Sequence, residues 1–165
     1  MLKPPQKFEI LPGCKTLLDN SSLAADLSIN GQVAAVEGNV LEVDEPSSIP
    51  WWRVVLMPVI NGLAAPTEYP DKVRGFRFRA RCDFMPPQLD SGQTYADIGL
   101  NLEHYLEGMH QKVYEVLDQA TLTVAHAEQL YNVRRRTSPG QMFRDQDKGY
   151  RYMTAEYITV LGPTT

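Results

Sequence analysis

Several features that would assign this chain of 165 residues to a particular class are missing from its sequence. It has only two cysteines, Cys14 and Cys82, which are too few for a disulfide framework and favour a reducing compartment. No apolar run approaches the roughly 20 residues that a membrane-spanning helix needs, and the beginning of the chain lacks a signal-peptide pattern. We therefore expect a soluble protein that has no contact with a membrane.

The short motifs that mark common active sites are also missing. The sequence has no glycine-rich phosphate loop, no dinucleotide-binding G-x-G-x-x-G after a strand, and no G-x-S-x-G nucleophile elbow. Its cysteines and histidines do not show zinc spacing. His126 lies on an expected strand, where a lone histidine is more often structural than catalytic. These absences leave no positive reason in the sequence to expect an enzyme or a cofactor.

One group of residues keeps an enzymatic alternative open. Glu103, Glu107 and His110 recur at steps of four and three on an expected helix, so they share a face. Carboxylates and imidazoles at this spacing bind metals in helical bundles, but such sites also take ligands from other helices. No second long helix is expected here, and a solvated helix face explains the spacing equally well. A small metal-dependent enzyme remains the less favoured alternative.

Charge of both signs is present, but it is unevenly placed. Residues 1–50 hold seven acids and three lysines, a net charge of −4, which equals the formal net charge of the chain. Residues 51–165 hold thirteen acids and thirteen bases, and all ten arginines lie there. Nucleic-acid binders usually show a basic excess over the whole domain. Balanced and segregated charge is more typical of contacts between protein subunits.

The pattern along the chain predicts a mixture of strands and one long helix. The first dozen residues are proline-rich and expected to be extended, and "LLDNSSLAADLSING" predicts a short helix followed by a turn at Asn30-Gly31. "WWRVVLMPVI" predicts a buried strand whose regular pairing ends at Pro58. Residues 94–118 carry the apolar stripe of a long helix, and "TLTVAHAEQLYNV" and "YRYMTAEYITVLGP" predict further strands.

This order of elements predicts an α+β fold, namely an antiparallel β-sheet with one long α-helix packed on one face. We divide the chain into an N-terminal extension, residues 1–48, with a short helix and possible strands, and a main domain, residues 49–165. Together the two parts are expected to form one compact unit.

The segment "GFRFRARCDF" turns its apolar side chains to one face of a strand and Arg77, Arg79 and Arg81 to the other. These arginines have three possible partners: acids such as Glu128 or Glu156 on neighbouring strands, acids of a neighbouring subunit, or phosphates of a nucleic acid. Arginines two apart on a strand lie about 7 Å from each other, which matches phosphate spacing. However, the aromatic residues that would stack on bases lie on the opposite face.

A second basic group lies in an expected polar loop over residues 134–149. It consists of Arg134, Arg135, Arg136 and Arg144. Loops of this kind often carry contacts between proteins, so we expect these four arginines and the three of the alternating strand to contribute to a subunit or partner interface. The alternative is a small nucleic-acid-binding module that uses the arginine strand, which would bind DNA with a steep salt dependence.

The segments "IPWWRVVLMP", "FRFRARCDF", "LNLEHYLEGMHQKVYEVLDQ", "TLTVAHAEQL" and "RDQDKGYRYMTAEYITVLGP" follow one another in an order that points to a known family. In pattern and order they resemble the tail terminator, or tail-completion, proteins of long-tailed bacteriophages. The resemblance covers about residues 49–162. Its features are a Pro–aromatic start of the first strand, one helix after a hairpin, and a polar turn before the final strand.

This resemblance implies a structural protein of the virion that has no enzymatic activity. Members of the family are similar in being small α+β subunits that close into a ring, usually a hexamer. The ring caps the tail tube and joins it to the head–tail connector, and DNA passes through it without specific binding. The implied partners are further copies of the chain, the tail tube protein and connector proteins. The implied location is the neck of the virion, after assembly in the host cytoplasm.

Overall fold

The structure is a computed structural model that describes residues 7–36, 44–46, 48–63, 75–123 and 130–161. Its strands are β1 (Asn30–Ala35), β2 (Trp51–Leu63), β3 (Gly75–Met85), β4 (Thr121–Thr123), β5 (Leu130–Thr137), β6 (Phe143–Arg144) and β7 (Arg151–Leu161). Its helices are α1 (Lys7–Asp19), α2 (Leu23–Leu27), the 3-10 turn η1 (Ala96–Ile98) and α3 (Leu102–Leu117). None of the helices described is long and apolar enough to cross a membrane.

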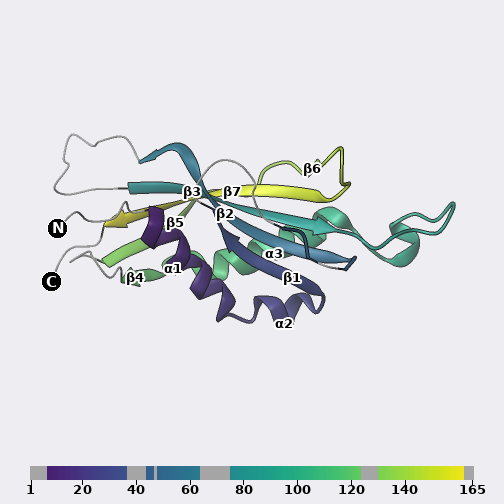
Figure 1. The fold of residues 1–165 in the computed structure, drawn as a ribbon, viewed down its shortest axis with the longest axis horizontal. Helices are drawn as coiled ribbons and strands as arrows, with labels where there is room; N and C mark the ends of the chain where they lie inside the picture. Colours follow the sequence, from purple (N-terminus) through teal and green to yellow (C-terminus); the bar gives the residue numbers. More distant parts are fainter. Residues whose placement is uncertain (1–6, 37–43, 47, 64–74, 124–129, 162–165) are drawn as a thin grey trace.

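The strands form one twisted sheet in the order β1-β2-β3-β7-β5-β4, with β6 beside β7 (Figure 1). The predicted antiparallel hairpin of β2 and β3 is confirmed, and its register shifts after Pro58 as expected. The prediction of an entirely antiparallel sheet is wrong, because β1 pairs with β2 in parallel. The connection over residues 36–50 is long enough for the crossover of about a dozen residues that parallel pairing requires.

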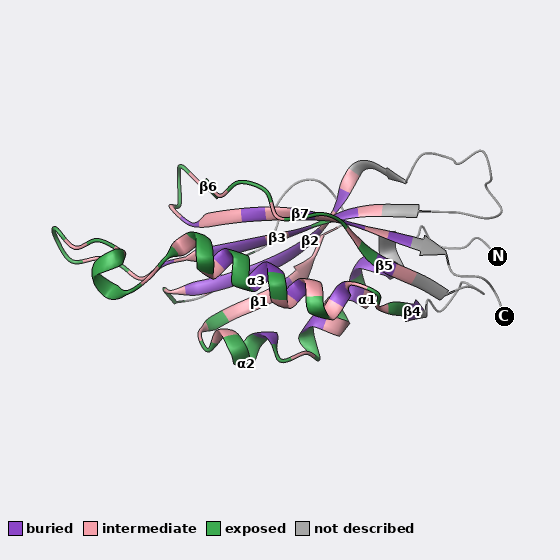
Figure 2. Ribbon diagram, turned by 180° about the vertical axis from the view of Figure 1, so that it is seen from behind, coloured by how far each residue is buried: buried purple, intermediate pink, exposed green. Residues whose placement is uncertain are grey.

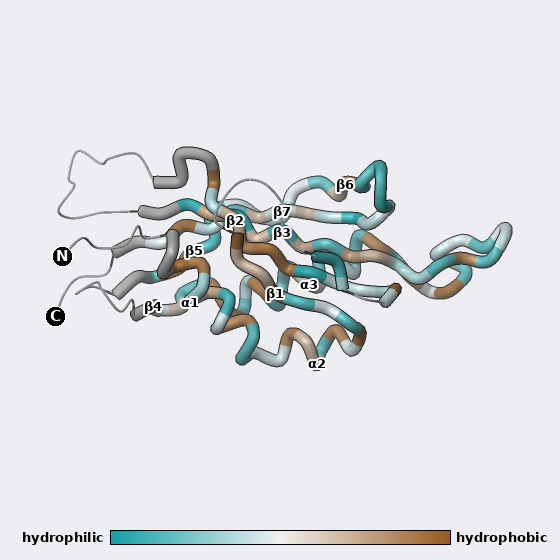
Figure 3. Tube along the Cα trace, in the orientation of Figure 1, coloured by the Kyte–Doolittle hydropathy of each residue, from teal (hydrophilic) through white to brown (hydrophobic). Residues whose placement is uncertain are grey.

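Helices α1 and α3 pack on the same face of the sheet and bury one shared core (Figures 1 and 2). The alternation predicted for β3 is confirmed, since Phe78, Ala80, Cys82 and Phe84 all point into this core. The hydropathy trace is strongly hydrophobic along β2, which crosses the middle of the molecule (Figure 3).

Two expectations about the helices are wrong. The long helix predicted over 94–118 starts only at Leu102, where the Asn101 side chain accepts a hydrogen bond from the His104 amide as an N-cap. The expected extended conformation of the first dozen residues is wrong for residues 7–12, because α1 begins at Lys7 and continues through Pro12. Residues 1–6 lie outside the described part of the chain. Burial of an apolar stripe on the core outweighs the helix-breaking tendency of proline. This stripe consists of Ile10, Leu11, Cys14 and Leu18.

The segment "TLTVAHAEQLYNV" contributes to two strands, β4 and β5, rather than one. His126 lies outside the residues that the structure describes.

After β3, residues 86–101 leave the sheet and form an arm at the right of Figure 1. The arm contains η1 and returns to the body at the start of α3.

Gly31 on β1 provides a test of how this edge of the sheet packs. A Cβ atom at Gly31 would lie 2.0 Å from the Trp52 ring, and the indole Nε1 of Trp52 donates a 2.9 Å hydrogen bond to the Ile29 carbonyl. We expect Gly31→Ala to lower the free energy of unfolding by about 1–3 kcal/mol through overpacking, measured by chemical denaturation.

The control for this substitution is Gly108→Ala, since Gly108 lies in α3 with open space around it. That change should raise the free energy of unfolding by about 1 kcal/mol, because alanine favours helix. A Gly31→Ala variant as stable as the wild type would contradict the packing described here.

Candidate functional site

The face of the sheet opposite the helices holds a buried ion pair. Arg53 on β2 and Asp83 on β3 lie directly opposite each other in the antiparallel register. The Arg53 Nη2 atom lies 2.8 Å from Asp83 Oδ2, and the two side chains are 2% and 0% exposed. Sequence analysis did not single out Arg53. The sequence does hold one signal for it, a charged residue within an otherwise apolar strand. If that strand is buried, its charged residue needs a partner of opposite charge.

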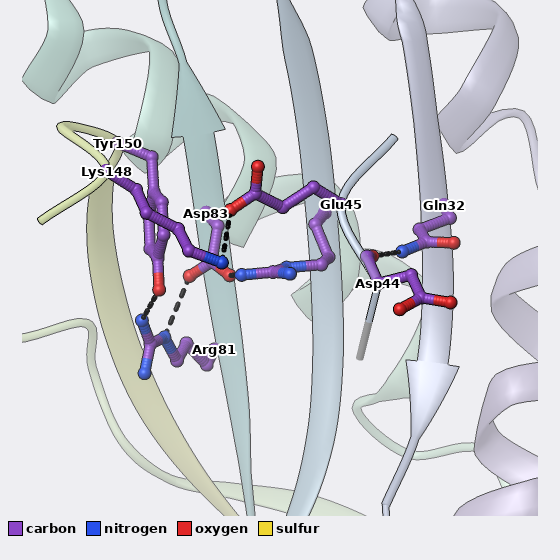
Figure 4. Close-up of polar contacts among 8 residues, drawn as sticks. Gln32, Asp44, Glu45, Arg81, Asp83, Lys148 and Tyr150 are labelled. Atoms are coloured by element: carbon purple, nitrogen blue, oxygen red, sulfur yellow. Dashed lines mark hydrogen bonds and ion pairs between the residues drawn. The ribbon is translucent and has the colours of Figure 1, made fainter. Parts of the chain in front are cut away.

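Arg81 and Tyr150 complete this group, which we call the buried arginine cluster (Figure 4). The Arg81 Nε donates to Asp83 Oδ1 at 2.8 Å, and its Nη2 donates to the Tyr150 hydroxyl at 2.9 Å. The Arg53 guanidinium lies 5.2 Å from the centre of the Tyr150 ring. Burial raises the pKa of the Asp83 carboxyl, and the guanidiniums of Arg81 and Arg53 oppose that rise.

A tight turn before β7 positions Tyr150 over the cluster. The Asp145 carboxylate accepts hydrogen bonds from the amides of Asp147 and Lys148, and Gly149 adopts φ 84°. Lys148 in turn reaches Glu45 on the crossover between β1 and β2, with 2.8 Å between Nζ and Oε1 (Figure 4). The cluster is therefore covered from two sides, and the Arg81 side chain, 17% exposed, has its partners within the chain. The part expected of Arg81 in an interface stays a prediction.

The other half of this sheet face is open. Arg77 on β3 and Arg136 on β5 both bind the Glu156 carboxylate on β7, which is one of the partners predicted for the arginine strand. Glu128, the other acid named, lies outside the described residues. Arg79 is exposed and makes no side-chain hydrogen bond or ion pair within the described part of the chain.

The predicted docking loop over 134–149 is in part a strand, because β5 continues to Thr137 and stays paired with β7. Alternation along β5 then separates its arginines. Arg135 turns to the helix side, where its guanidinium lies 3.9 Å from the Tyr114 ring. Arg134 is exposed and donates only to the Val133 carbonyl, at 3.4 Å, while Arg144 on β6 is exposed.

Four of the seven predicted arginines thus share one surface, which we call the open basic face. Its charged members are Arg77, Arg79, Arg134, Arg136 and Glu156. Half-buried Met57 and Ile158 lie among them, in register with Arg79 and with Arg77, and provide apolar area. Among the described residues this face has four guanidiniums for one carboxylate, so it favours an acidic partner.

The residues of the metal-site alternative are not brought together. Glu103 and Glu107 are exposed, as expected for a solvated helix face, but His110 is 1% exposed and points to the sheet. Its Nε2 lies 2.8 Å from the Met153 carbonyl oxygen, so the interpretation as a solvated face is wrong for His110. Across the described residues, no group of three acidic, histidine or cysteine side chains could hold a metal ion.

Neither a family model nor a curated protein matches the chain.

The buried ion pair predicts a specific pattern of stabilities. Arg53→Met leaves the Asp83 carboxylate buried with a single guanidinium, so we expect a loss of about 3–5 kcal/mol in the free energy of unfolding. The double variant Arg53→Met/Asp83→Leu removes both charges and should recover a large part of that loss. Chemical denaturation of the two variants measures this, and equal losses in both would contradict the assignment.

His110 predicts how stability depends on pH. Burial lowers its pKa to about 4, against about 6.5 in the unfolded chain. As the pH falls from about 6.5 to about 4, the unfolded chain takes up a proton that the folded chain excludes, so stability decreases by on the order of 3 kcal/mol.

The measurement is the difference in unfolding free energy between about pH 7 and about pH 4.5, compared between the wild type and His110→Gln. The variant should lose less stability on acidification than the wild type. His104→Gln, on the exposed side of the same helix, is the matched control. Equal acid sensitivity of the wild type and His110→Gln would contradict the prediction.

Proposed function

We propose that this protein is a structural subunit of a bacteriophage neck, a tail terminator that closes into a ring, caps the tail tube and joins it to the head–tail connector. The observation that supports this most directly is the open basic face, where Arg79 and Arg134 stand exposed on the two strands that flank β7, β3 and β5. A ring subunit needs two different and complementary side surfaces, because the contact is head-to-tail. An arginine-rich sheet face suits one of them.

The chemistry of the open basic face favours protein over nucleic acid as its partner. A surface that binds single strands usually offers aromatic rings for base stacking, whereas this face offers Met57 and Ile158. On this side of the sheet, Trp51 and Tyr150 are buried with Arg53, and the half-buried Tyr152 ring lies against the Arg81 guanidinium. The net charge of −4 also opposes general attraction to DNA.

In this proposal the subunit has a structural role, which is to occupy the junction between the tail tube and the connector, and it has no enzymatic activity. Its partners are copies of itself, the tail tube protein and the connector proteins, and DNA passes through the ring without specific recognition. It assembles in the host cytoplasm and stays in the virion neck.

One observation favours a second candidate, a nucleic-acid-binding module. The Phe143 ring on β6 is 51% exposed, stacks on Tyr152 and lies next to the exposed Arg144. An aromatic ring beside a guanidinium is a common stacking platform for bases.

Light scattering over a range of protein concentrations, combined with a DNA titration of the same sample, separates the two candidates. We expect growth toward a closed ring of about six chains and weak DNA binding. A monomer at every concentration would contradict the ring. If that monomer bound DNA with a steep salt dependence, the nucleic-acid module would take its place.

A further inference from the structure

Within the described residues, the positive charge of the open basic face is only partly neutralised. Arg77 and Arg136 share the one carboxylate of Glu156, while Arg79 and Arg134 have no acidic partner in the part of the chain described. Guanidiniums on paired strands are held at fixed spacings, and each can bind a carboxylate through two parallel hydrogen bonds. The face is therefore suited to a partner that brings several carboxylates together with some apolar surface.

The chain itself contains a segment with that composition. Residues 86–103, which we call the acidic arm, carry Asp90, Asp97 and Glu103 and contain no lysine or arginine. All three acids are exposed. Ile98, between them, is 41% exposed and provides apolar area beside the carboxylates.

Local hydrogen bonds hold the acidic arm in one shape. The Thr94 amide donates to the Asp97 carboxylate at 2.8 Å, and the Leu100 amide donates to the Tyr95 carbonyl at 2.9 Å. Gly99, with φ 70°, ends the η1 turn. A segment ordered before binding loses less conformational entropy when it docks, so the arm is preorganised for contact.

The acidic arm and the open basic face of one molecule are far apart. Strand β3 carries Arg79 six positions before Met85, the last residue before the arm, which is about 20 Å at about 3.4 Å per residue. From there the arm extends away from the sheet (Figure 1). A contact between the two surfaces consequently joins different molecules.

We propose that the open basic face of one copy binds the acidic arm of a second copy, with Ile98 against Met57 and Ile158 and the carboxylates against Arg79 and Arg134. The apolar residues form the centre of the contact and the charges its rim, as in other protein interfaces. Because the two surfaces differ, the contact is head-to-tail and repeats from copy to copy. This inference rests on the proposed ring and names the two sides of its subunit contact.

Two variants, each lacking one of the two surfaces, test the contact. The face variant, Arg79→Glu/Arg134→Glu, changes exposed side chains that form no ion pair within the described residues. The arm variant, Asp90→Lys/Ile98→Ser/Glu103→Lys, leaves Asp97 and its turn intact. Each variant alone should be monomeric.

Mixed in equal amounts, the two variants should form a dimer and grow no further. The arm variant supplies an intact face and the face variant supplies an intact arm, so each molecule can make only one contact. Sedimentation velocity measures this as a doubling of mass over either variant alone. A mixture that stays monomeric, or a single variant that assembles like the wild type, would overturn the proposal. The unfolding transitions of both variants show whether each is still folded. If the face variant has lost its fold, Arg79→Gln replaces it, and if the arm variant has lost its fold, Glu103→Gln replaces it.

The wild type distinguishes failure of this contact from failure of the ring. Rings of the wild type without a dimer in the mixture would overturn the contact and leave the proposed ring standing. A dimer in the mixture together with open fibres of the wild type would support the contact and contradict the closed ring. Growth of the wild type should also weaken with salt, since exposed charges are screened.

Discussion

The ion pair between Arg53 and Asp83 is the constraint on which one whole face of this molecule depends. Both side chains are removed from water, so each must stay beside the other to avoid a buried unpaired charge. Opposite positions on β2 and β3 satisfy that requirement in one register only. Arg81 and Tyr150 fill the remaining hydrogen-bonding positions and bind the start of β7 to the cluster.

The same ion pair also divides the face into two halves. Around Asp83 the arginines are turned inward and covered, whereas Arg79, four residues earlier on β3, is exposed and Arg77, six residues earlier, is half-buried beside Glu156. One alternating strand thus provides both a structural and an exposed set of guanidiniums. The difference depends on the segment before β7, which is distant in sequence.

Sequence patterns were sufficient for the strands with strict alternation and for the body of α3. They failed for α1, because its prolines suggested an extended chain while the burial of Ile10 and Leu18 favoured helix. They also failed for the direction of β1, since a short strand carries no sign of parallel pairing. The arginines appeared equivalent in the sequence, because periodicity reports which face a residue takes and not what covers that face.

The position of β7 in the sheet has a consequence for how the protein is made. It is the last described strand in the sequence, yet it lies between β3 and β5. While the ribosome is still extending the chain, β3 has a free edge and the core is incomplete, and such an edge can pair with other chains. Folding of the sheet is completed only after residue 161 has left the ribosome. Rapid release of the chain, or a chaperone that covers the free edge of β3 until then, should therefore raise the yield of native subunits.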